Sequence, residues 1–542
     1  MQKPDAGGQT AGGGSMRSSV GAFSVATVVS RILGLAREMV FAHVFGAGLA
    51  MDAFVVAFRI PNLLRDIFAE GVMSAAFVPV YVEYQEGEGE EGAHRFANVV
   101  LNVLMVAAGL TTILGIVAAP FVVRVIGAGF DAVPGKLQIT TRLTQLLFPF
   151  LFLVGLSALS AAILNCHRRF FVPALAPAMV NIGFIAAGLA LCPLLGAAGY
   201  PPIIGMAVGA LAGGAGQLLI QLPNLWRVGF RYRPLFDLSH PGLRRFLCLV
   251  GPVVIGVSAT KINTVINTFL VTFLAQRSVS YLHYAFRLMQ FPLGVFGVGV
   301  ATVALPALSR HHETRDRESM RATLDRALKL VIFLTAPCAV LLLALAHPIC
   351  QLLYEHGEFG PADTAATAQA LMLYALGIIA VGTVKVLASA FYSLGDAKTP
   401  MFMTGLSAAV NVGINLGLMH VIFFRSFALA TSIAAVVNAV ALAYILRRRL
   451  GDIGLREVGS MAIRVLIAAA GGGVAAWLLV GRLDAVLEPM RLVGSIISVG
   501  AAGAVGLAVY WVLASAFGVE DARTVRIRGI AQLFLGDRRN ET

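Results

Sequence analysis

Apolar segments of 20 residues or more recur along almost the whole chain and leave little room for any other kind of structure. Segments of this length and composition are typical of helices that cross a lipid bilayer. We identify fourteen, centred near residues 28, 62, 110, 152, 184, 214, 258, 294, 338, 379, 410, 435, 468 and 504. The sequence therefore predicts an all-α integral membrane protein with about 14 transmembrane helices.

The polar parts of the chain are too short for a soluble domain. Only 13% of the residues are charged, against about a quarter in an average soluble domain. Residues 1–19 are polar and glycine-rich, and we expect a disordered N-terminal extension there rather than a cleavable signal peptide. The five cysteines form no CxxC motif and are typical of apolar side chains in helices.

The formal net charge is +13, and the distribution of the basic residues along the chain agrees with the predicted topology. If the N-terminus is cytoplasmic, 26 Lys and Arg residues fall on the cytoplasmic side and seven on the other side. Such a bias is the positive-inside pattern of bacterial inner-membrane proteins. We therefore expect a multi-pass inner-membrane protein with both termini in the cytoplasm, and no nucleic-acid partner.

A weak internal repeat divides the chain into two similar halves. AFRIPNLL at 57–64 resembles AFRLMQFP at 285–292, and SAAFVPVY at 74–81 resembles ATVALPAL at 301–308. Six helices per half would give two lobes related by a pseudo-two-fold axis, with a cavity between them. The predicted parts are an N-lobe (20–227), a basic cytoplasmic linker (228–246), a C-lobe (247–447), two further helices (448–517) and a basic cytoplasmic tail (518–542). The composition of the linker fits either a segment that binds anionic lipid headgroups or a simple connection between the lobes.

Charged residues lie inside the second predicted span. Asp52, Arg59 and Asp66 are seven residues apart, and Glu70 follows four residues later, so the four share one helical stripe, with Arg65 beside it. Each charge is costly in a membrane, so the stripe should face protein or a water-filled cavity. Arg59 is then expected to pair with one of the two aspartates of its own helix, which would make it mainly structural.

Other predicted spans also carry polar faces. The first contains Arg31, Arg37 and Glu38, the seventh contains Asn263 and Asn267 on one stripe with Lys261 beside it, the eighth contains Arg287, and the tenth contains Lys385. Polar contacts between helices would also explain the asparagines. The basic residues outnumber the acids, so a cavity lined by them should take an anion, and arginine is suited to a phosphate or diphosphate.

Several chemistries find no support in the sequence. There is no GxxxxGK[ST] motif for nucleotide hydrolysis and no cluster of acids and histidines for an enzyme acting on lipid phosphates. We expect no catalytic residue, no metal and no cofactor. Transport would then depend on the membrane potential or on an ion whose identity is open.

Four stretches resemble the MviN/MurJ lipid II flippases of the multidrug/oligosaccharidyl-lipid/polysaccharide exporter superfamily. They are SRILGLAREMVFAHVFGAG (30–48), the segment 51–84 beginning MDAFVVAFRIPNLL, YAFRLMQFPLGVFGVGVATVALPALS (284–309) and the segment 354–400 beginning YEHGEFGPAD. The resemblance implies two six-helix lobes and two extra helices that form a hydrophobic groove. It also implies movement of lipid II, an undecaprenyl-diphosphate-linked muropeptide, from the inner to the outer leaflet by alternating access.

The resemblance assigns roles to single residues. It places cavity arginines at Arg31, Arg37, Arg65 and Arg287, and the functional aspartate of the second span at Asp52. Many family members carry acids near the last of these arginines, where this chain has Phe286 and Gln290. The acidic partner of Arg287 is therefore expected to be missing, which puts any ion coupling through it in doubt.

These observations lead to specific hypotheses. Arg65 and Arg287 should bind the diphosphate directly, while the prenyl tail should lie in a shallow groove formed by the small residues of 462–481 in the last two spans. Lipid II and membrane lipids are the expected partners, with other cell-wall synthesis proteins as further candidates. The alternatives are another exporter of the superfamily or a membrane enzyme acting on polyprenyl-phosphate lipids.

Overall fold

The computed structural model describes residues 12–66, 73, 75–487 and 491–519, and this part of the chain consists of helices joined by loops, without a β-strand. Its first part consists of α1 (Gly12–Phe45), α2 (Leu49–Arg65), α3 (Val78–Gly87), α4 (Gly89–Ile126), η2 (Ala128–Ala132), α5 (Lys136–Leu147), α6 (Pro149–Cys166), α7 (Phe171–Ala186), η3 (Ala187–Leu191), α8 (Cys192–Ala197), α9 (Ile203–Leu219) and α10 (Leu222–Arg227).

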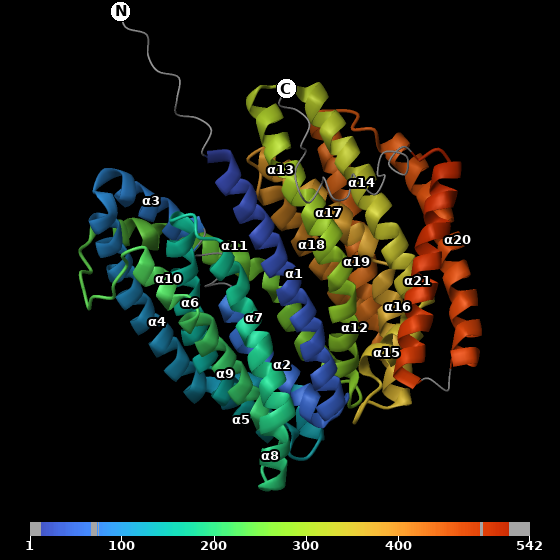
Figure 1. Cartoon of the computed structure of the whole chain (residues 1–542), viewed down its shortest axis with the longest axis horizontal. Coiled ribbons are helices and arrows are strands. Elements are labelled where there is room, and N and C mark those ends of the chain that lie inside the picture. The colour runs from blue at the N-terminus through green and yellow to red at the C-terminus, as the bar shows by residue number, and fades with distance from the viewer. Residues whose placement is uncertain (1–11, 67–72, 74, 488–490, 520–542) are drawn as a thin grey trace, which may run out of the picture.

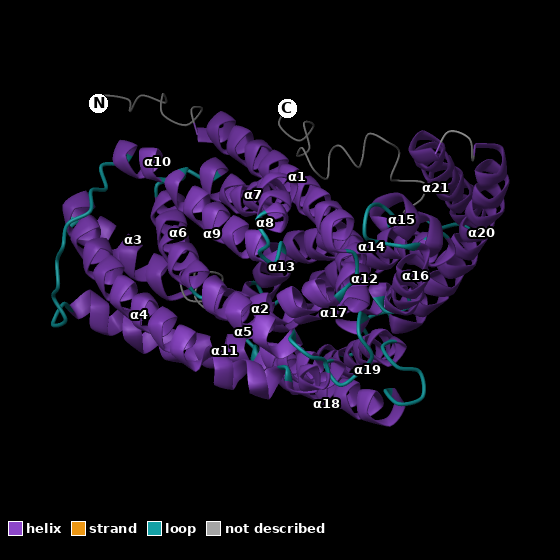
Figure 2. Ribbon diagram, turned by 90° about the horizontal axis from the view of Figure 1, so that it is seen from below, coloured by secondary structure: helices purple, strands orange, loops and turns teal. Residues whose placement is uncertain are grey.

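The second part consists of α11 (Pro241–Val271), α12 (Ser278–Pro292), η4 (Leu293–Gly297), α13 (Val298–Glu313), α14 (Arg317–Ala344), α15 (Ala346–Tyr354), α16 (Pro361–Ala375), α17 (Ile378–Ser393), α18 (Lys398–Leu418) and α19 (Arg425–Leu450). Two helices follow, α20 (Leu455–Leu487) and α21 (Arg491–Ala516). Figures 1 and 2 show two bundles side by side, with α1 and α11 along their boundary and α20 and α21 at the outer edge of the second bundle.

Ten helical segments in the described residues are long and apolar enough to cross a membrane, or eleven if the pair α16 and α17, bent by 42°, forms one span. The remaining expected spans fall on α1, α2 and α11. Those three carry seven of the charged side chains predicted to lie within the membrane, which lowers their hydropathy. A multi-pass membrane protein is confirmed, and the count of fourteen spans is compatible with the structure.

Proline and glycine explain where several helices begin or bend. Helices α6, α11 and α16 begin at Pro149, Pro241 and Pro361, where the missing N–H would have no partner within the helix. Gly357 has a φ of +63° and packs against the backbone carbonyl of His43, so no larger residue fits this contact between the bundles.

The predicted extension at 1–19 overlaps a helix. Helix α1 begins at Gly12, so residues 12–19 continue the first span rather than forming a disordered segment, while residues 1–11 lie outside the described residues. A helix can continue into water past its apolar part, because its backbone hydrogen bonds are made internally, and hydropathy does not detect this continuation.

The linker between the bundles is an extended strap held against α4. The side chain of Asn98 accepts a hydrogen bond from the backbone of Arg233 at 2.7 Å and donates one to the carbonyl of Arg231 at 3.1 Å. Asn102 donates to the carbonyls of Arg233 and Leu235 at 3.1 and 3.0 Å. Two buried amides of α4 therefore fix the course of the strap.

Two glycines of α20 pack closely against neighbouring helices. Gly472 packs against the carbonyl of Gly506 in α21, and Gly473 packs against Val340 in α14, whereas the space around Gly481 is open. The shallow groove for the prenyl tail stays a prediction. The apolar side chains of this helix that remain exposed include Ile467 and Trp477.

Candidate functional site

A cavity of about 430 Å³ lies between the bundles, where α1 faces α12, α14 and α15. Its walls differ in character. The ionisable residues on its lining are Arg31, Arg37, Glu38 and Arg287, whereas the apolar wall opposite includes Leu341, Leu342, Ile349 and Leu353. Three cations and one acid leave a surplus of two positive charges on this lining. The cavity thus combines an anion-binding wall with an apolar one.

Glu38 is the centre of the charged wall. It is buried, and its carboxylate forms ion pairs with Arg37 beside it and with Arg287 of α12, whose Nε lies 3.3 Å away. Nε2 of His283 contacts the other carboxylate oxygen at 3.1 Å. The prediction that Arg287 lacks an acidic partner is therefore wrong. The acid comes from α1, 249 positions earlier in the chain. The residues next to Arg287 in sequence therefore do not indicate it.

Arg31 and Arg37 are held by protein oxygens as well. Arg31 donates to the carbonyl of Gly294 at 3.1 Å, within the π-helical turn η4. A π turn follows Pro292 here, and such turns occur often at functional sites. Arg37 donates to the side-chain oxygen of Asn181 at 3.1 Å, and its guanidinium lies 5.5 Å from the ring centre of Phe184. These contacts orient both guanidinium groups before any ligand binds.

The charges of α2 pair differently from the prediction. Asp66 accepts from Arg65 at 2.8 Å and from Lys261 of α11 at 2.6 Å, and Asp52 is engaged elsewhere. Arg59 forms no ion pair with any of the described residues. The expected pairing of Arg59 within its own helix is wrong, because Lys136 pairs with Asp52, and Arg65 and Lys261 pair with Asp66.

The four arginines of the prediction do not all line one cavity. Arg287 lies within electrostatic range of Arg37, Arg59 and Arg65, although Arg65 is not part of the cavity lining. Glu70, the last residue of the predicted stripe, lies outside the described residues. Arg31, Arg37 and Arg287 are therefore the predicted arginines that share the cavity.

Asp52 is a contact between the bundles rather than a cavity residue. It is 1% exposed, and its carboxylate pairs with Lys136 at 2.8 Å. It also accepts from the backbone N–H groups of Arg277 and Ser280, each at 2.9 Å, and from the Ser280 hydroxyl at 2.6 Å. Asp52 of α2 thereby caps the first turn of α12. The N-terminus of a helix is a favourable position for an anion. All of its acceptor capacity is used, so it cannot bind a ligand in this conformation.

Further contacts close the same end of the molecule. The Tyr284 hydroxyl donates to the carbonyl of Gly46 at 3.0 Å, and the backbone N–H of Glu358 donates to the carbonyl of His43, also at 3.0 Å. These contacts lie at the end opposite to the start of α1, at the lower edge of Figure 1. The bundles are joined there, below the charged wall of the cavity.

The predicted asparagines bridge helices. Asn267 donates to Asn411 of α18 at 2.8 Å, accepts from Asn415 at 2.9 Å, and lies 3.3 Å from Asn263 on its own helix. This network matches the interpretation of polar contacts between helices. The side chain of Lys385 lies beside Gly297 of η4, at the edge of the same region but outside the cavity lining.

Three partners were not predicted from the sequence: His283 and Asn181, which contact the charged wall, and Lys136, which pairs with Asp52. Only His283 left a signal that could have been found, because it precedes Arg287 by four residues and therefore shares a face of α12 with it. The other two are single polar residues whose positions carry no helical pattern.

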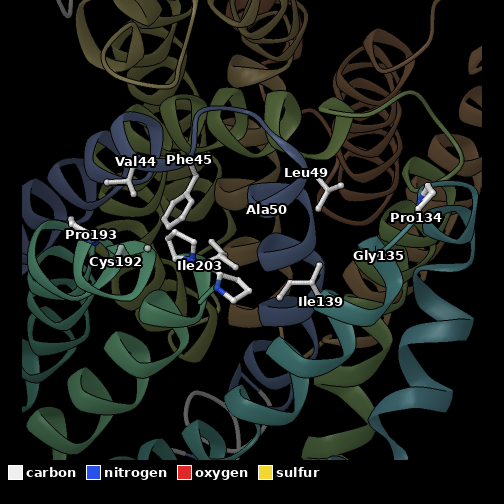
Figure 3. A pocket seen from close by; sticks show the side chains of 13 residues that line it. Val44, Phe45, Leu49, Ala50, Pro134, Gly135, Ile139, Cys192, Pro193 and Ile203 are labelled. Atoms are coloured by element: carbon white, nitrogen blue, oxygen red, sulfur yellow. The ribbon is translucent and has the colours of Figure 1, made fainter. Parts of the chain in front are cut away.

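A second pocket, of about 460 Å³, lies where α1 meets α2, near α5 and α8 (Figure 3). Its lining contains no charged side chain: Val44, Phe45, Leu49 and Ile139 contribute to it, together with prolines 134, 193, 201 and 202. It offers no group that would recognise a diphosphate.

Comparisons with known proteins agree with this arrangement. A family model described as lipid II flippase MurJ matches residues 41–495, which is most of the chain. The chain belongs to this family. The lipid II flippase MurJ of Burkholderia cenocepacia is 34% identical over 427 residues, covering 78% of this chain and 82% of that protein. A probable MurJ of Rhizobium tropici is 34% identical over 509 residues, covering 92% and 94%.

Solved structures give the same result for the fold. A lipid II flippase MurJ in an inward closed conformation aligns with a TM-score of 0.74 at 27% identity, covering 93% of this chain and 99% of that one. An inward-facing multidrug resistance transporter of the MATE family aligns with a TM-score of 0.67 at 15% identity, covering 81% and 99%. The second similarity concerns the fold alone. The MurJ family thus shares both the sequence and the architecture of this chain.

Proposed function

We propose that this protein is a lipid II flippase that moves undecaprenyl-diphosphate-linked peptidoglycan precursor from the inner to the outer leaflet of the bacterial inner membrane. The observation that carries the proposal is the charged wall of Arg31, Arg37 and Arg287 around a single acid, in a cavity between two bundles. A diphosphate brings negative charge that matches the surplus of this wall, and the guanidinium fork fits its oxygens in bidentate fashion.

The existing ion pairs limit how tightly the diphosphate binds. Arg37 and Arg287 already contact Glu38, so a ligand must compete with a buried carboxylate for the same guanidinium groups. A site of this kind binds an anion without holding it permanently. Weak retention suits a transporter, which has to release its cargo on the other side of the membrane.

Alternating access would move the headgroup through the membrane. The contacts around Asp52 and Tyr284 close one end of the molecule, and they have to break before the cavity opens there. The prenyl tail would stay in hydrocarbon. The apolar wall of the cavity is formed by α14 and α15, and Val340 of α14 packs on α20, so the last two helices remain the proposed neighbours of the tail.

The membrane potential is a sufficient driving force on physical grounds. An inside-negative potential of about 100 mV favours outward movement of a headgroup with two negative charges by roughly 4–5 kcal/mol. We therefore propose coupling to the potential, or to an ion not yet identified, without a nucleotide or another cofactor. Both termini would lie in the cytoplasm, and other cell-wall synthesis proteins are candidate partners.

Native mass spectrometry of the protein purified in mild detergent tests the cargo. We expect a retained lipid diphosphate of the mass of lipid II, with less of it in Arg287→Ala at equal protein abundance. In parallel, the gene should restore growth of cells depleted of their own flippase. Failure of both, with the protein present in the membrane, would contradict the proposal. Retention of a drug or another polysaccharide lipid instead would favour the exporter alternative.

A further inference from the structure

A second group of polar residues lies at the other end of the first bundle, away from the cavity. Glu90 and His94 occupy the first turns of α4, and His167 follows the last residue of α6. One ligand atom from each of the three lies within 4.8 Å of the other two. Glu90 and His94 are four residues apart, so a helix presents them on one face. The third residue comes from a different element, 73 positions later.

We infer that these three residues form a site for one transition-metal dication of the Zn²⁺ type, a role separate from transport of the lipid. Two imidazoles and a carboxylate are a ligand set that zinc takes in proteins. Glu90 Oε2 lies 3.0 Å from Nε2 of His167 and 3.7 Å from Nε2 of His94. Ligand atoms around a tetrahedral zinc ion with bonds of about 2.0–2.2 Å are themselves about 3.3 Å apart. The distances from Glu90 to the two histidine nitrogens therefore lie on either side of the value that a bound ion requires.

The hydrogen bonds of His167 show why a cation belongs between them. Its Nδ1 lies 2.9 Å from the backbone carbonyl of Ile163, an oxygen that can only accept, so Nδ1 must carry a proton. In the neutral ring Nε2 is then a bare acceptor, yet it faces a carboxylate oxygen of Glu90 at 3.0 Å. Two acceptors repel at this distance unless a positive species lies between them, either a metal ion or a second proton on the ring. A backbone carbonyl on the far nitrogen is also what orients histidines that bind metals.

Two further observations favour the metal over the second proton. Nε2 of His94 is buried and has no hydrogen-bond partner among the described residues, although it lies close to the same carboxylate. A proton shared by His167 and Glu90 would leave this nitrogen unsatisfied, whereas a metal ion would bind all three groups. The second oxygen of Glu90 accepts from the Gln85 amide at 2.8 Å, which holds the carboxylate in place.

The position of the site gives the ion a role in the fold. The His94 ring packs edge-on against Phe230 of the strap, with ring centres 5.6 Å apart, and the next turn of α4 carries Asn98, which holds the strap. A metal bound to His94 and His167 would connect α4, the end of α6 and the strap between the bundles. We therefore expect the ion to stabilise this end of the first bundle.

Zinc binding to the full-length protein, purified without a histidine tag and treated with a chelator, tests the inference. The probe is ZnCl₂ alone, with affinity measured by competition against a metal indicator and stoichiometry by elemental analysis. We expect one zinc per chain and a rise in melting temperature. His94→Ala and His167→Ala should each weaken binding by about 100-fold or more, because even indirect partners of metal ligands are worth 10–100-fold. Glu90→Gln keeps the shape of an exposed side chain and should weaken binding by about 10-fold.

Controls separate this site from unspecific binding. The double variant His311→Ala/His312→Ala removes an adjacent histidine pair at the end of α13 and should bind zinc as the original protein does. Ca²⁺, which prefers oxygen ligands, should not compete. The inference is wrong if zinc does not bind in a one-to-one ratio, if it is lost only with the His311/His312 pair, or if Glu90→Gln and His167→Ala bind it unchanged. X-ray absorption at the zinc edge must show two imidazole ligands, and a different ligand set would also overturn the assignment.

Discussion

At the scale of residues, one buried carboxylate organises the charged wall of the cavity. Glu38 is 2% exposed and shares its charge with two arginines and a histidine. In a site of low polarity, an arginine without a counter-ion would be costly, and a fully neutralised one would not attract a diphosphate. Glu38 pairs with Arg37 and Arg287 but does not neutralise both, while Arg31 is held by the carbonyl of Gly294, so Glu38 sets the charge available to the ligand.

Replacing Glu38 with glutamine should destabilise the protein and impair transport. The change leaves two guanidinium groups facing a neutral amide, and breaking a buried ion pair costs about 3–5 kcal/mol. We expect the lower end of that range, because the side chain of Arg287 is 44% exposed. Melting temperature in detergent and complementation of flippase-depleted cells measure the two effects. The exposed residue Glu86 provides the control, Glu86→Gln, and equal stability of the two variants would argue against the central role of Glu38.

Arg59 becomes a candidate ligand because no acid pairs with it among the described residues. Substitution by lysine keeps the charge and removes the bidentate fork. We expect Arg59→Lys and Arg287→Lys to slow flipping by about tenfold, the effect of losing roughly 1.4 kcal/mol of binding to the diphosphate. Arg65→Lys should have a smaller effect, since Asp66 already holds that guanidinium.

The assay for these variants is lipid II flipping in proteoliposomes at matched protein content. Arg124→Lys, an exposed position at the end of α4, is the control and should flip normally. Full activity of Arg59→Lys, together with loss in Arg65→Lys, would show that the paired arginine binds the cargo and the unpaired one does not.

At the scale of elements, the turn between α17 and α18 is fixed by a carboxylate outside the membrane. Asp396 accepts from the backbone N–H and hydroxyl of Thr399 at 3.0 and 2.6 Å, and it pairs with Arg449 at 2.5 Å. These hydrogen bonds, the bonds from Thr399 above all, lower the pKa of Asp396 to about 2. The charged carboxylate thus joins the start of α18 to the end of α19.

The lowered pKa predicts a dependence of stability on pH. Asp396 has a lower pKa in the folded state than the ordinary value of 3.8, so its stabilising effect is complete above about pH 4 and is lost as the pH falls toward 2. Asp396→Asn should therefore lower the melting temperature at pH 7, and the difference from the original protein should shrink at pH 3. A difference that stays constant between the two pH values would mean that the charge has no part in it.

The last two helices belong to the core of the second bundle. Val465 and Ala468 of α20 pack in one cluster with residues of α14, and the Tyr510 hydroxyl of α21 donates to the carbonyl of Phe333 at 2.7 Å. Removing these helices would expose that cluster. We therefore expect a deletion after residue 455 to destabilise the second bundle, because the remaining helices would lose part of their packing.

At the scale of the whole molecule, transport by alternating access requires the contacts at the end opposite to the start of α1 to break. A backbone hydrogen bond of 3.0 Å joins Glu358 to His43 across the bundles, and both side chains are exposed. Cysteines at these two positions, in a background with the exposed Cys248 replaced by serine, should form a disulfide that holds this end closed.

We expect the oxidised double-cysteine variant to lose flipping and to regain it with a reductant. His43→Cys and Glu358→Cys alone should be active under both conditions. Proteoliposome flipping before and after reduction measures the effect, and mass spectrometry establishes how much disulfide has formed. If the fully oxidised protein flips lipid II at the normal rate, this end of the molecule does not need to open.

The sequence by itself determined the helical membrane architecture, the family and the residue types of the charged wall. Apolar segments long enough to cross a bilayer leave the backbone no other way to satisfy its hydrogen bonds, so local composition is decisive. The arginines were visible for the same reason, because a charge in an apolar segment is costly and conspicuous.

Only the tertiary structure decided which charges meet. Periodicity shows which residues share a face of one helix, and on that basis Arg59 was expected to pair with Asp52 or Asp66, and Arg287 to lack an acid. In the structure Asp52 pairs with Lys136, and Asp66 pairs with Lys261 and Arg65. Arg287 pairs with Glu38 of α1. An ion pair depends on distances between helices that are far apart in sequence, and these distances are set by the packing of the bundles rather than by the pattern within any one helix.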